Sequence, residues 1–438
     1  MTFRTIAIVG AGYSGSLLAA NIVRRAVDRQ VWLIERSGVF GRGLAYSTTC
    51  PEHLLNVRSG RMSAFADDPD HFVRWLEREH PALADPQGFA PRMVYGDYVE
   101  HILAEAGEDI RRVSGEVTAI ETSPEGVTVR MGSERDLAVD AAVLAVGNPP
   151  PSDANARGLA DSERYIGDPW LAGGLGRIGS GDDVLLLGAG LTMVDVVLAL
   201  RAQGWKGRAL ALSRRGLLPR PHDAEQHHAA ARRPEAETLG GMMREVRARM
   251  REVGWGQAMD ELRPYNQAAW RHATEAERGR FLRHLRPWWD VHRHRTAPQV
   301  GAKIAELVES GRLRVASGRV EVVEPLPDGL AIDWRPRGGR GSRSERFGWM
   351  VNCTGPLADL SRSDDPLLSQ LFASGAARVD PASLGLDVED DCRVQDAAGR
   401  PHRRLFALGP PTRGAFWEII AVPDIREQAA GLAARLVA

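Results

Sequence analysis

Short apolar runs, glycine turns and helical periodicity alternate at the start of the chain. Thr5 to Val9 is apolar and β-branched, and after a glycine-rich turn Ser16 to Arg25 carries apolar residues at helical spacing. Gln30 to Ile34 is again an apolar run of strand length. The pattern predicts a strand, a tight turn, a helix and a second strand, which is the order of a βαβ unit.

The turn between the first strand and the helix has the spacing of a phosphate-binding loop. Gly10 permits the tight turn, Gly12 lets the backbone approach a pyrophosphate, and Gly15 lets helix and strand pack closely. Glu35 follows the second strand, where an acid accepts hydrogen bonds from ribose hydroxyls. A glycine turn alone is weak evidence, but strand, turn, helix, strand and acid in register predict a dinucleotide site.

A second glycine turn occurs at Gly188 and Gly190, and Met193 takes the place of the third glycine. The spacing from Gly10 to Glu35, counted again from Gly188, ends at Ser213-Arg214-Arg215 instead of an acid. A hydroxyl residue followed by arginine suits a 2′-phosphate. We therefore predict FAD in the first site and NADPH in the second. The alternatives are an empty, degenerate nucleotide fold and a solvated arginine pair.

The two halves of the chain repeat one plan, in which a βαβ unit is followed by an alternating hairpin and a buried strand that ends in glycine. We predict an α/β fold with two Rossmann-like dinucleotide-binding domains, each with a small β-meander, plus a helical insertion. The predicted FAD domain covers residues 1–155 and 366–438. The predicted NADPH domain covers residues 178–365, with the insertion at about 221–300, where the strand pattern stops.

Composition narrows the class of protein only slightly. A net charge of -1 gives no general attraction to nucleic acid, and no apolar run is long enough for a membrane span or a signal peptide. We therefore expect a cytoplasmic protein with no nucleic-acid or membrane partner. The three cysteines show no CxxC spacing, and the arginines that flank His292 and His294 would repel a cation, so we predict no metal site.

Seven segments, spread from end to end, carry a resemblance to known flavoproteins. They are Gly41 to Ser47, His53 to Val57, Met62 to Ala64, Tyr95 to Tyr98, Gly190 to Asp195, Arg286 to Arg295 and Thr412 to Glu418. With them the chain resembles the two-dinucleotide-domain flavoproteins, which include flavin-containing monooxygenases, lysine and ornithine N-monooxygenases and pyridine-nucleotide reductases. It is most similar to a bacterial family of FAD/NAD(P)-binding proteins. The resemblance implies fold and cofactors much more than substrate.

The resemblance also implies where the cofactors touch the chain. It places the pyrophosphate of FAD on Gly10 to Gly15, the adenosine ribose on Glu35, adenine beside the main chain of Val117, and the flavin ring near Asn56. Relatives usually have Gly-Asp after the late strand, but this chain has Gly409-Pro410, so ribityl contacts are expected from Ile420 to Pro423. The other predicted cofactor contacts are Tyr13, Ser14, Arg36, Gly43, Leu44, Met62, Ser63, Gly147, Asn148, Leu191 and Thr192.

Three residues are predicted to be catalytic: Asn56, Arg413 and Trp417. Arg413 follows Gly409 closely, and its guanidinium there would clamp a substrate carboxylate or stabilise the negative charge of reduced flavin. The alternative is an ion pair with Glu418 or Asp424. Because flavin carries the redox chemistry, the lack of a catalytic triad does not count against an enzyme.

Taken together, the sequence predicts an NADPH-dependent FAD oxidoreductase. We favour a single-component flavin monooxygenase that uses molecular oxygen and acts on a small nucleophilic substrate, for which an amine is one candidate. The alternatives are an NADPH-dependent flavin reductase or dehydrogenase that passes electrons to another acceptor, and a flavin-bearing redox partner protein with the insertion as its docking surface. The sequence gives no oligomeric state.

Overall fold

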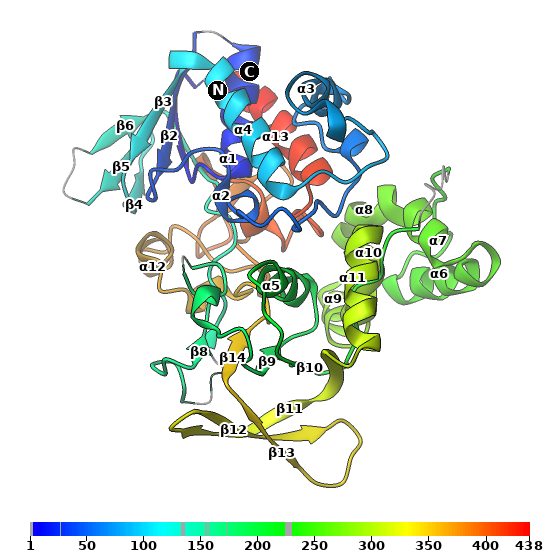
Figure 1. Ribbon diagram of the computed structural model, residues 1–438. Coiled ribbons are helices and arrows are strands. Elements are labelled where there is room, and N and C mark those ends of the chain that lie inside the picture. The colour runs from blue at the N-terminus through cyan, green and yellow to red at the C-terminus, as the bar shows by residue number, and fades with distance from the viewer. Residues whose placement is uncertain are drawn as a thin grey trace.

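Two open sheets form the body of the molecule, and each is built around a core of parallel strands (Figure 1). The computed structural model describes residues 3–26, 28–132, 136–153, 156, 158–171, 173–223 and 230–438. Both termini lie close together at the first sheet, because the chain passes into the second sheet and then returns. The two-domain α/β fold predicted from the sequence is confirmed.

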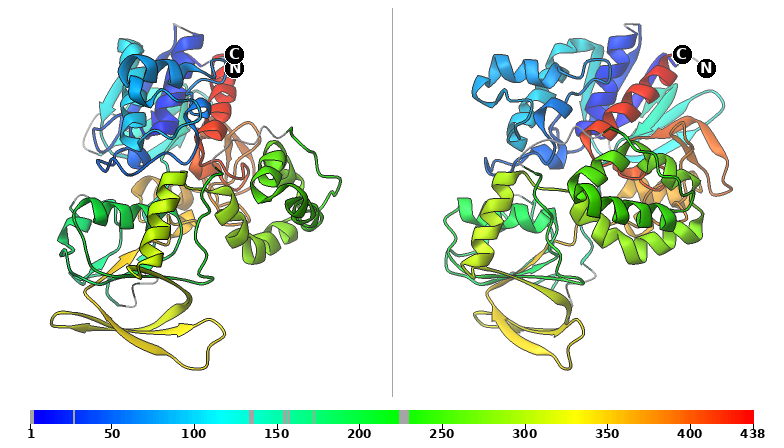
Figure 2. Two further views of the ribbon diagram at one scale, coloured as in Figure 1. Left: turned by 45° about the vertical axis from the view of Figure 1, so that its right-hand side comes forward. Right: turned by 90° about the vertical axis from the view of Figure 1, so that its right-hand side faces the viewer.

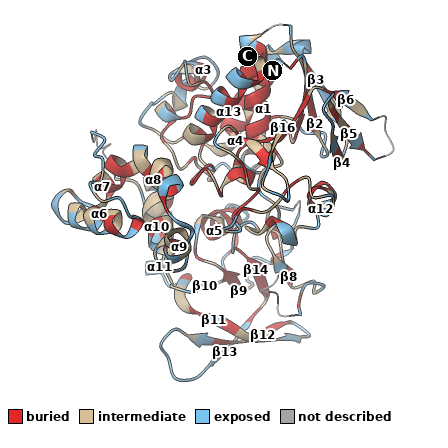
Figure 3. Ribbon diagram, turned by 180° about the vertical axis from the view of Figure 1, so that it is seen from behind, coloured by how far each residue is buried: buried red, intermediate tan, exposed pale blue. Residues whose placement is uncertain are grey.

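The first sheet has strand order β15-β16-β7-β1-β2-β3. Its parallel strands are β1 (Thr5–Val9), β2 (Gln30–Glu35), β3 (Ile110–Ser114), β7 (Ala141–Leu144) and β16 (Pro401–Ala407), and β15 (Arg393–Gln395) runs antiparallel at the edge. Helix α1 (Tyr13–Arg25) packs on this sheet, α4 (Arg92–Glu105) and α13 (Val422–Val437) pack on α1, and α3 (His71–Glu79) belongs to the same hydrophobic core. The central strands are buried, as expected for parallel strands covered on both faces (Figure 3).

The second sheet has strand order β13-β12-β11-β10-β9-β14-β8. Its parallel part contains β8 (Tyr165–Ile166), β9 (Val184–Leu187), β10 (Ala209–Ser213), the first half of β11 (Leu313–Leu326) and β14 (Trp349–Asn352), with α5 (Leu191–Ala202) and α11 (Pro298–Glu309) packed on one face. The second half of β11 pairs with β12 (Gly329–Pro336), which pairs with β13 (Arg343–Phe347). This hairpin is the predicted second meander.

The first meander is a separate sheet of β4 (Val117–Thr122), β5 (Val127–Met131) and β6 (Leu137–Val139), and α12 (Pro366–Ala373) packs on β4. The predicted domain boundaries remain a prediction. The second sheet includes β8, which precedes residue 178, and residue 155 lies outside the described part of the chain.

The predicted insertion consists of short helices beside the second sheet (Figure 2). They are α6 (Leu239–Val253), α7 (Trp255–Leu262), α8 (Asn266–His272), α9 (Glu275–Arg280) and α10 (Arg286–Arg293). Trp270 of α8 stacks on Trp417 with ring centroids 4.4 Å apart, so the insertion shares its core with the segment that follows β16. His292 lies on a helix rather than a strand, so it does not share a face with His294.

Glu418 fixes the insertion to this C-terminal segment. Its carboxylate is 4% exposed and accepts hydrogen bonds from Asn266 Nδ2 at 3.1 Å, Trp289 Nε1 at 2.7 Å and Arg293 Nε at 2.9 Å. The backbone of Glu418 has a φ of 68°, which is costly for a residue with a side chain. The three bonds from the insertion hold it there.

Replacing Glu418 with alanine should lower the free energy of unfolding by about 3 kcal/mol, because three buried donors lose their acceptor and Arg293 keeps only Asp424, which is 3.8 Å from its Nη2. Denaturant titration of the flavin-loaded protein measures this change. The matched control is Glu427→Ala, which removes a mostly exposed carboxylate from α13 and should cost less than about 0.5 kcal/mol. Equal losses for the two variants would contradict the role of Glu418.

Candidate functional site

The first glycine turn is shaped by two close backbone contacts. Gly10 has a φ of 100°, and a Cβ there would lie 2.4 Å from the carbonyl oxygen of Ala145; a Cβ at Gly15 would lie 1.9 Å from the carbonyl oxygen of Gly10. Neither position therefore accepts a side chain. Gly12 differs, because a Cβ there would meet only Gly43, with its Cα at 3.3 Å. The turn is a narrow backbone cradle at the start of α1.

Glu35 is held beside this cradle. Oε2 accepts a hydrogen bond from Ala11 N at 2.9 Å, and Oε1 accepts from the backbone N and hydroxyl of Ser37 at 3.0 and 2.9 Å. Oε2 therefore keeps a second lone pair for a ligand hydroxyl, whereas Oε1 already accepts two hydrogen bonds. The neighbouring Arg36 points to Asp365 at 3.4 Å instead, so its charge is already paired.

Several other predicted contacts lie around the same turn. Gly43 begins α2 (Gly43–Tyr46) opposite Gly12, and a Cβ at Gly409, which has a φ of 75°, would lie 2.5 Å from Ser14 Oγ. The ring of Tyr13 packs in a buried tyrosine cluster, whereas Leu44 is 59% exposed. The structure therefore brings Gly12, Gly43 and Gly409, from three distant segments, to one place.

The loop from Asn56 to Ser63 is tied on both sides. The carbonyl of Asn56 accepts a hydrogen bond from His222 Nε2 at 2.9 Å, and burial lowers the pKa of His222 to about 4. The side chains of Met62 and Ser63 are buried, and the Ser63 hydroxyl donates to the carbonyl of Asp68 at 2.5 Å. Both side chains therefore serve the packing of the loop, which leaves backbone atoms as their means of contact with a ligand.

Val117 begins β4, and Gly147 follows the end of β7. Gly115 N donates to the carbonyl of Glu35 at 3.1 Å, which places the start of β4 beside the acid. Gly147 follows β7 with a φ of 70°, and a side chain there would meet no described atom within 4 Å. Asn148 comes next, on the way out of the first sheet.

The second glycine turn repeats the geometry of the first. Gly188 has a φ of 116°, and a Cβ there would lie 2.3 Å from the carbonyl oxygen of Cys353. At Gly190 a Cβ would meet no described atom within 4 Å, so the space above the turn is open. Leu191 and Thr192 begin α5, and Met193 is fully buried where the first turn has its third glycine.

The residues after β10 leave two positive charges available. The hydroxyl of Ser213 accepts a hydrogen bond from Gly216 N at 2.9 Å, which shapes the turn. Arg214 is exposed and Arg215 half-buried. Among the residues that the structure describes, no carboxylate lies within ion-pair distance of either guanidinium. This arrangement favours a phosphate ligand over an internal salt bridge.

Arg413 has neither of the partners considered from the sequence. Glu418 is bound to Arg293, and Asp424 lies 3.5 Å from Arg263. Arg413 Nε is buried without a hydrogen-bond partner in the described structure, and the guanidinium lies 5.6 Å from the centre of the Trp417 ring. Burial, followed by the charge of nearby Arg286, lowers the pKa of Arg413 to about 10.

Trp417 itself is 3% exposed. One face stacks on Trp270, and the edge of its ring meets Phe281. Trp417 therefore packs the core and supports Arg413, and its catalytic role stays a prediction.

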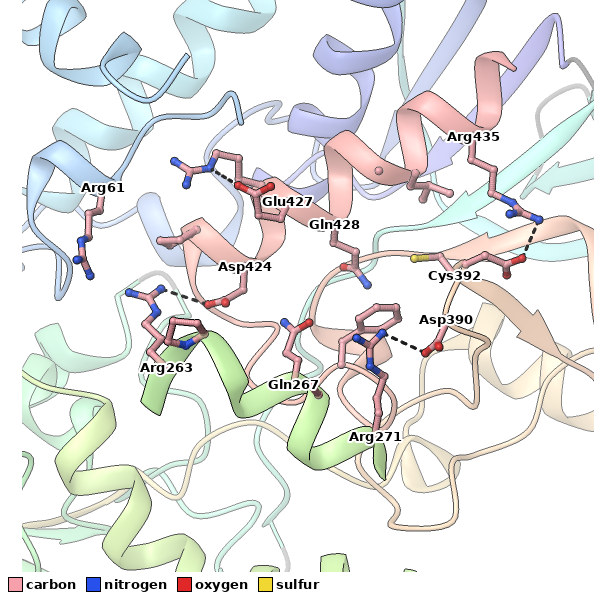
Figure 4. A pocket seen from close by; sticks show the side chains of 18 residues that line it. Arg61, Arg263, Gln267, Arg271, Asp390, Cys392, Asp424, Glu427, Gln428 and Arg435 are labelled. Carbon is pink, nitrogen blue, oxygen red and sulfur yellow. Dashed lines mark hydrogen bonds and ion pairs between the residues drawn. The ribbon is translucent and has the colours of Figure 1, made fainter. Parts of the chain in front are cut away.

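A cavity of about 800 Å³ lies between α13, α8 and the loop before β15 (Figure 4). Ion pairs line it: Arg263 with Asp424, Arg271 with Asp390 at 3.3 Å, and Arg435 with Asp391 at 2.7 Å. Pro423, predicted as a cofactor contact, lies on its wall, and Ile420 is partly exposed nearby in sequence. No sequence pattern indicated this cavity, because its walls come from four distant segments.

The two domains are also linked directly. Arg92 of α4 donates to Asp195 of α5 at 2.6 Å, and His53 Nε2 lies 2.8 Å from the carbonyl of Asp195. Burial lowers the pKa of His53, so the ring is held neutral at this contact. Asp195 belongs to a segment that carried the resemblance, but its partner could not be found from sequence spacing.

Comparison with known proteins gives a match that includes the first glycine turn. Residues 7–149 match the family model described as FAD-NAD(P)-binding. The chain therefore contains an FAD-NAD(P)-binding domain. Part of the chain is also 34% identical, over 126 residues, to an L-aspartate N-monooxygenase (nitrosuccinate-forming) of Streptomyces cremeus. That match covers 26% of this chain and only 19% of the relative.

Solved structures show that the FAD-NAD(P)-binding domain sits in a known two-domain fold. An ornithine N-hydroxylase of Kutzneria sp. 744 matches with a TM-score of 0.71 and 15% identity, over 100% of this chain and 99% of that one. An L-lysine 6-monooxygenase of Pseudomonas syringae matches with a TM-score of 0.68 and 17% identity, over 99% of both chains. At these identities the likeness concerns the fold.

Two further searches of the described residues gave no candidate. None of their helices has both the length and the apolar composition for a membrane crossing. The same part of the chain contains no group of three or more histidine, cysteine, aspartate or glutamate side chains arranged to hold a metal ion.

Valine at the middle glycine of each turn should separate the two sites. Gly12→Val should yield protein with little bound flavin, because the side chain fills the cradle against Gly43. Gly190→Val should stay yellow and melt near the parent temperature, since its side chain enters open space, but NADPH should reduce it slowly. Flavin absorbance after gel filtration and stopped-flow reduction measure both. If Gly190→Val loses its flavin and Gly12→Val keeps it, the sites are assigned in the wrong order.

Proposed function

We propose that this protein is an NADPH-dependent FAD monooxygenase that oxygenates the nitrogen of a small amine carrying a carboxylate. The observation that carries the proposal is the pair of glycine turns in one chain, one followed by a fixed acid and the other by two arginines without a carboxylate partner among the described residues. The named activities of the similar proteins support it, because they are N-oxygenations of aspartate, ornithine and lysine.

The first turn fits the ADP half of FAD. The cradle between Gly12 and Gly43 gives backbone access to a pyrophosphate at the N-terminus of α1, and Oε2 of Glu35 keeps a lone pair for a ribose hydroxyl. When bound, FAD supplies the redox chemistry by accepting hydride and activating oxygen. The contribution of the chain is to bind and orient the reactants.

The second turn fits NADPH better than NADH. The open space above Gly190 admits a pyrophosphate at the start of α5, and the strand end nearby carries Arg214 and Arg215 without described carboxylate partners. Guanidinium groups that are not committed to carboxylates form charge-assisted hydrogen bonds to a 2′-phosphate. Met193 is fully buried at the position where a third glycine would stand.

Arg413 is the residue that we assign to the substrate. A buried guanidinium without an anionic partner is unfavourable unless a ligand supplies the charge. Trp417 supports the guanidinium from one side. Asp290 and Glu418 attract it against the repulsion from Arg286 without forming an ion pair with it. A carboxylate of the substrate would supply the missing hydrogen-bond acceptor and the negative charge. The amine of the substrate would then be directed away from Arg413. We keep Asn56 as a proposed contact of the flavin ring.

The test is amine-dependent oxygenation by the purified, FAD-loaded protein. NADPH oxidation, oxygen uptake and hydroxylamine formation should rise together with one of aspartate, ornithine or lysine, as followed by mass spectrometry with ¹⁸O₂. Fast NADPH oxidation that reduces an added quinone without oxygen uptake would establish a reductase instead. Slow NADPH oxidation with every acceptor would favour a redox partner protein.

Removing both arginines after β10 should alter coenzyme choice. Arg214→Ala with Arg215→Ala should raise the half-saturating NADPH concentration at least about tenfold, since each charge-assisted hydrogen bond contributes about 1.5–3 kcal/mol. The limiting reduction rate and the use of NADH should change little. The charge-matched control removes Arg319 and Arg335, which are exposed on the β11–β12 hairpin. An equal loss of both coenzymes would refute phosphate contact.

Arg413→Gln should discriminate between substrates with and without a carboxylate. If the parent accepts lysine, the variant should raise its KM by about ten- to hundredfold, through loss of charged hydrogen bonds worth about 1.5–3 kcal/mol. Cadaverine, which is lysine without the carboxylate, should be affected much less. Arg335→Gln is the control for loss of a positive charge. If Arg413→Gln weakens lysine and cadaverine equally, Arg413 has a structural role.

A further inference from the structure

A second cavity, of about 360 Å³, lies beside the turn that follows Arg214 and Arg215. Gly216, the next residue, is on its wall, and its other walls are mainly apolar: Leu217, Leu218, Trp288, Val291, Val308 and Val315. These residues come from the segment after β10, from α10 of the insertion, and from α11 and β11. The volume is within the range of about 300–1,000 Å³ that is typical of small-molecule sites.

Two side chains of this cavity are unusually exposed for their type. Trp288 is 47% and Val308 is 40% exposed, and both face the same cavity. The adjacent Trp289 turns inward to Glu418 and is 7% exposed. The tryptophan pair of α10 is therefore divided between core and cavity. Single exposed apolar side chains are common on protein surfaces, but here they gather around one concave site. A tryptophan in such a site indicates a ligand with a flat apolar face.

The walls of the cavity are held in register with the strand end. Arg220 N donates to the carbonyl of Val291 at 3.0 Å, and the carbonyl of Arg220 accepts from Thr296 N at 3.0 Å. Gly216 has a φ of 61° and lies against the backbone of Ser317, so the turn after Arg215 is fixed as well. Helix α10 is thus attached to the phosphate-selecting end of the second domain.

Two polar residues, Arg220 and His292, also line the cavity, and His292 matches a nucleobase. Because the carbonyl of Trp288 can only accept, His292 Nδ1 donates to it at 2.7 Å. Burial lowers the pKa of His292, so the ring stays neutral at pH 7 and Nε2 is left as an acceptor. Adenine offers an amino donor at its edge and two apolar faces. The flat face of Trp288 and the acceptor on His292 therefore fit adenine better than an aliphatic chain.

We propose that this cavity receives the adenine ring of NADPH, with Trp288 stacking on the ring while Arg214 and Arg215 bind the 2′-phosphate. The inference rests on the coenzyme site of the proposed function and adds a role for the insertion. The insertion recognises the coenzyme, and the Rossmann turn does not do so alone.

The test uses adenosine 2′,5′-bisphosphate, which contains the adenine and the 2′-phosphate but cannot transfer hydride. Its binding to the FAD-loaded protein is measured by isothermal titration calorimetry. Trp288→Ala should weaken binding about tenfold, since stacking of a base on an aromatic side chain contributes about 1–3 kcal/mol. Trp288→Phe should restore binding to within about threefold of the parent. Leu171→Ala, at an exposed apolar residue outside the cavity, should bind as the parent does.

Salt dependence separates stacking from charge. Trp288→Ala should lose the same factor at low and high salt, whereas Arg215→Ala should flatten the salt dependence of the parent. If Trp288→Ala binds as tightly as the parent, or if Trp288→Phe is as weak as Trp288→Ala, the adenine lies elsewhere and the inference fails. In that case, rapid reduction of the parent by NADPH would leave the proposed function standing. A parent that neither binds the bisphosphate nor is reduced by NADPH overturns both.

Discussion

The close approach of a glycine to the carbonyl of a neighbouring strand end is the contact from which both halves of this molecule are built. Gly10 meets the carbonyl of Ala145 after β7, and Gly188 meets the carbonyl of Cys353 after β14. The two contacts are equivalent in the repeated plan of the chain. At each, any larger residue would push the turn away from the sheet, and the helix behind it would lose its aim at a phosphate.

Three bodies converge through a few buried polar groups. Arg92 and Asp195 join the two nucleotide domains, and Glu418 joins the insertion to the segment that follows the first sheet. Buried ion pairs of this kind contribute little net stability compared with apolar packing, but they tolerate only one arrangement of their partners. They are therefore suited to setting where the flavin end, the coenzyme end and Arg413 lie relative to one another.

The unpaired charges of the structure are as informative as the paired ones. Most arginines near the domain junction have carboxylates: Arg263, Arg271, Arg293 and Arg435 all do. Arg214, Arg215 and Arg413 have none among the described residues. A flavoprotein needs little more than binding groups of this kind, since the cofactor supplies the reactive atoms.

The sequence by itself determined the elements and their local chemistry. The glycine spacings, the apolar strands and Glu35 are read from neighbours a few positions apart, because backbone geometry and helix or strand periodicity are local properties. The difference between Glu35 and Arg214 at equivalent strand ends is local too. These features were enough to predict the fold and two dinucleotide sites.

Only the tertiary structure decided which side chains are free to act. Ser63, Met62 and Trp417 carry plausible chemistry in the sequence, yet they are buried in the packing of loop or core. Arg413 became a stronger candidate for binding an anionic ligand, because Glu418 and Asp424 bind other arginines. The cavity beside Trp288 is lined by residues far apart in the sequence, from Gly216 to Val315. Such partnerships depend on contacts between distant segments, which no local pattern encodes.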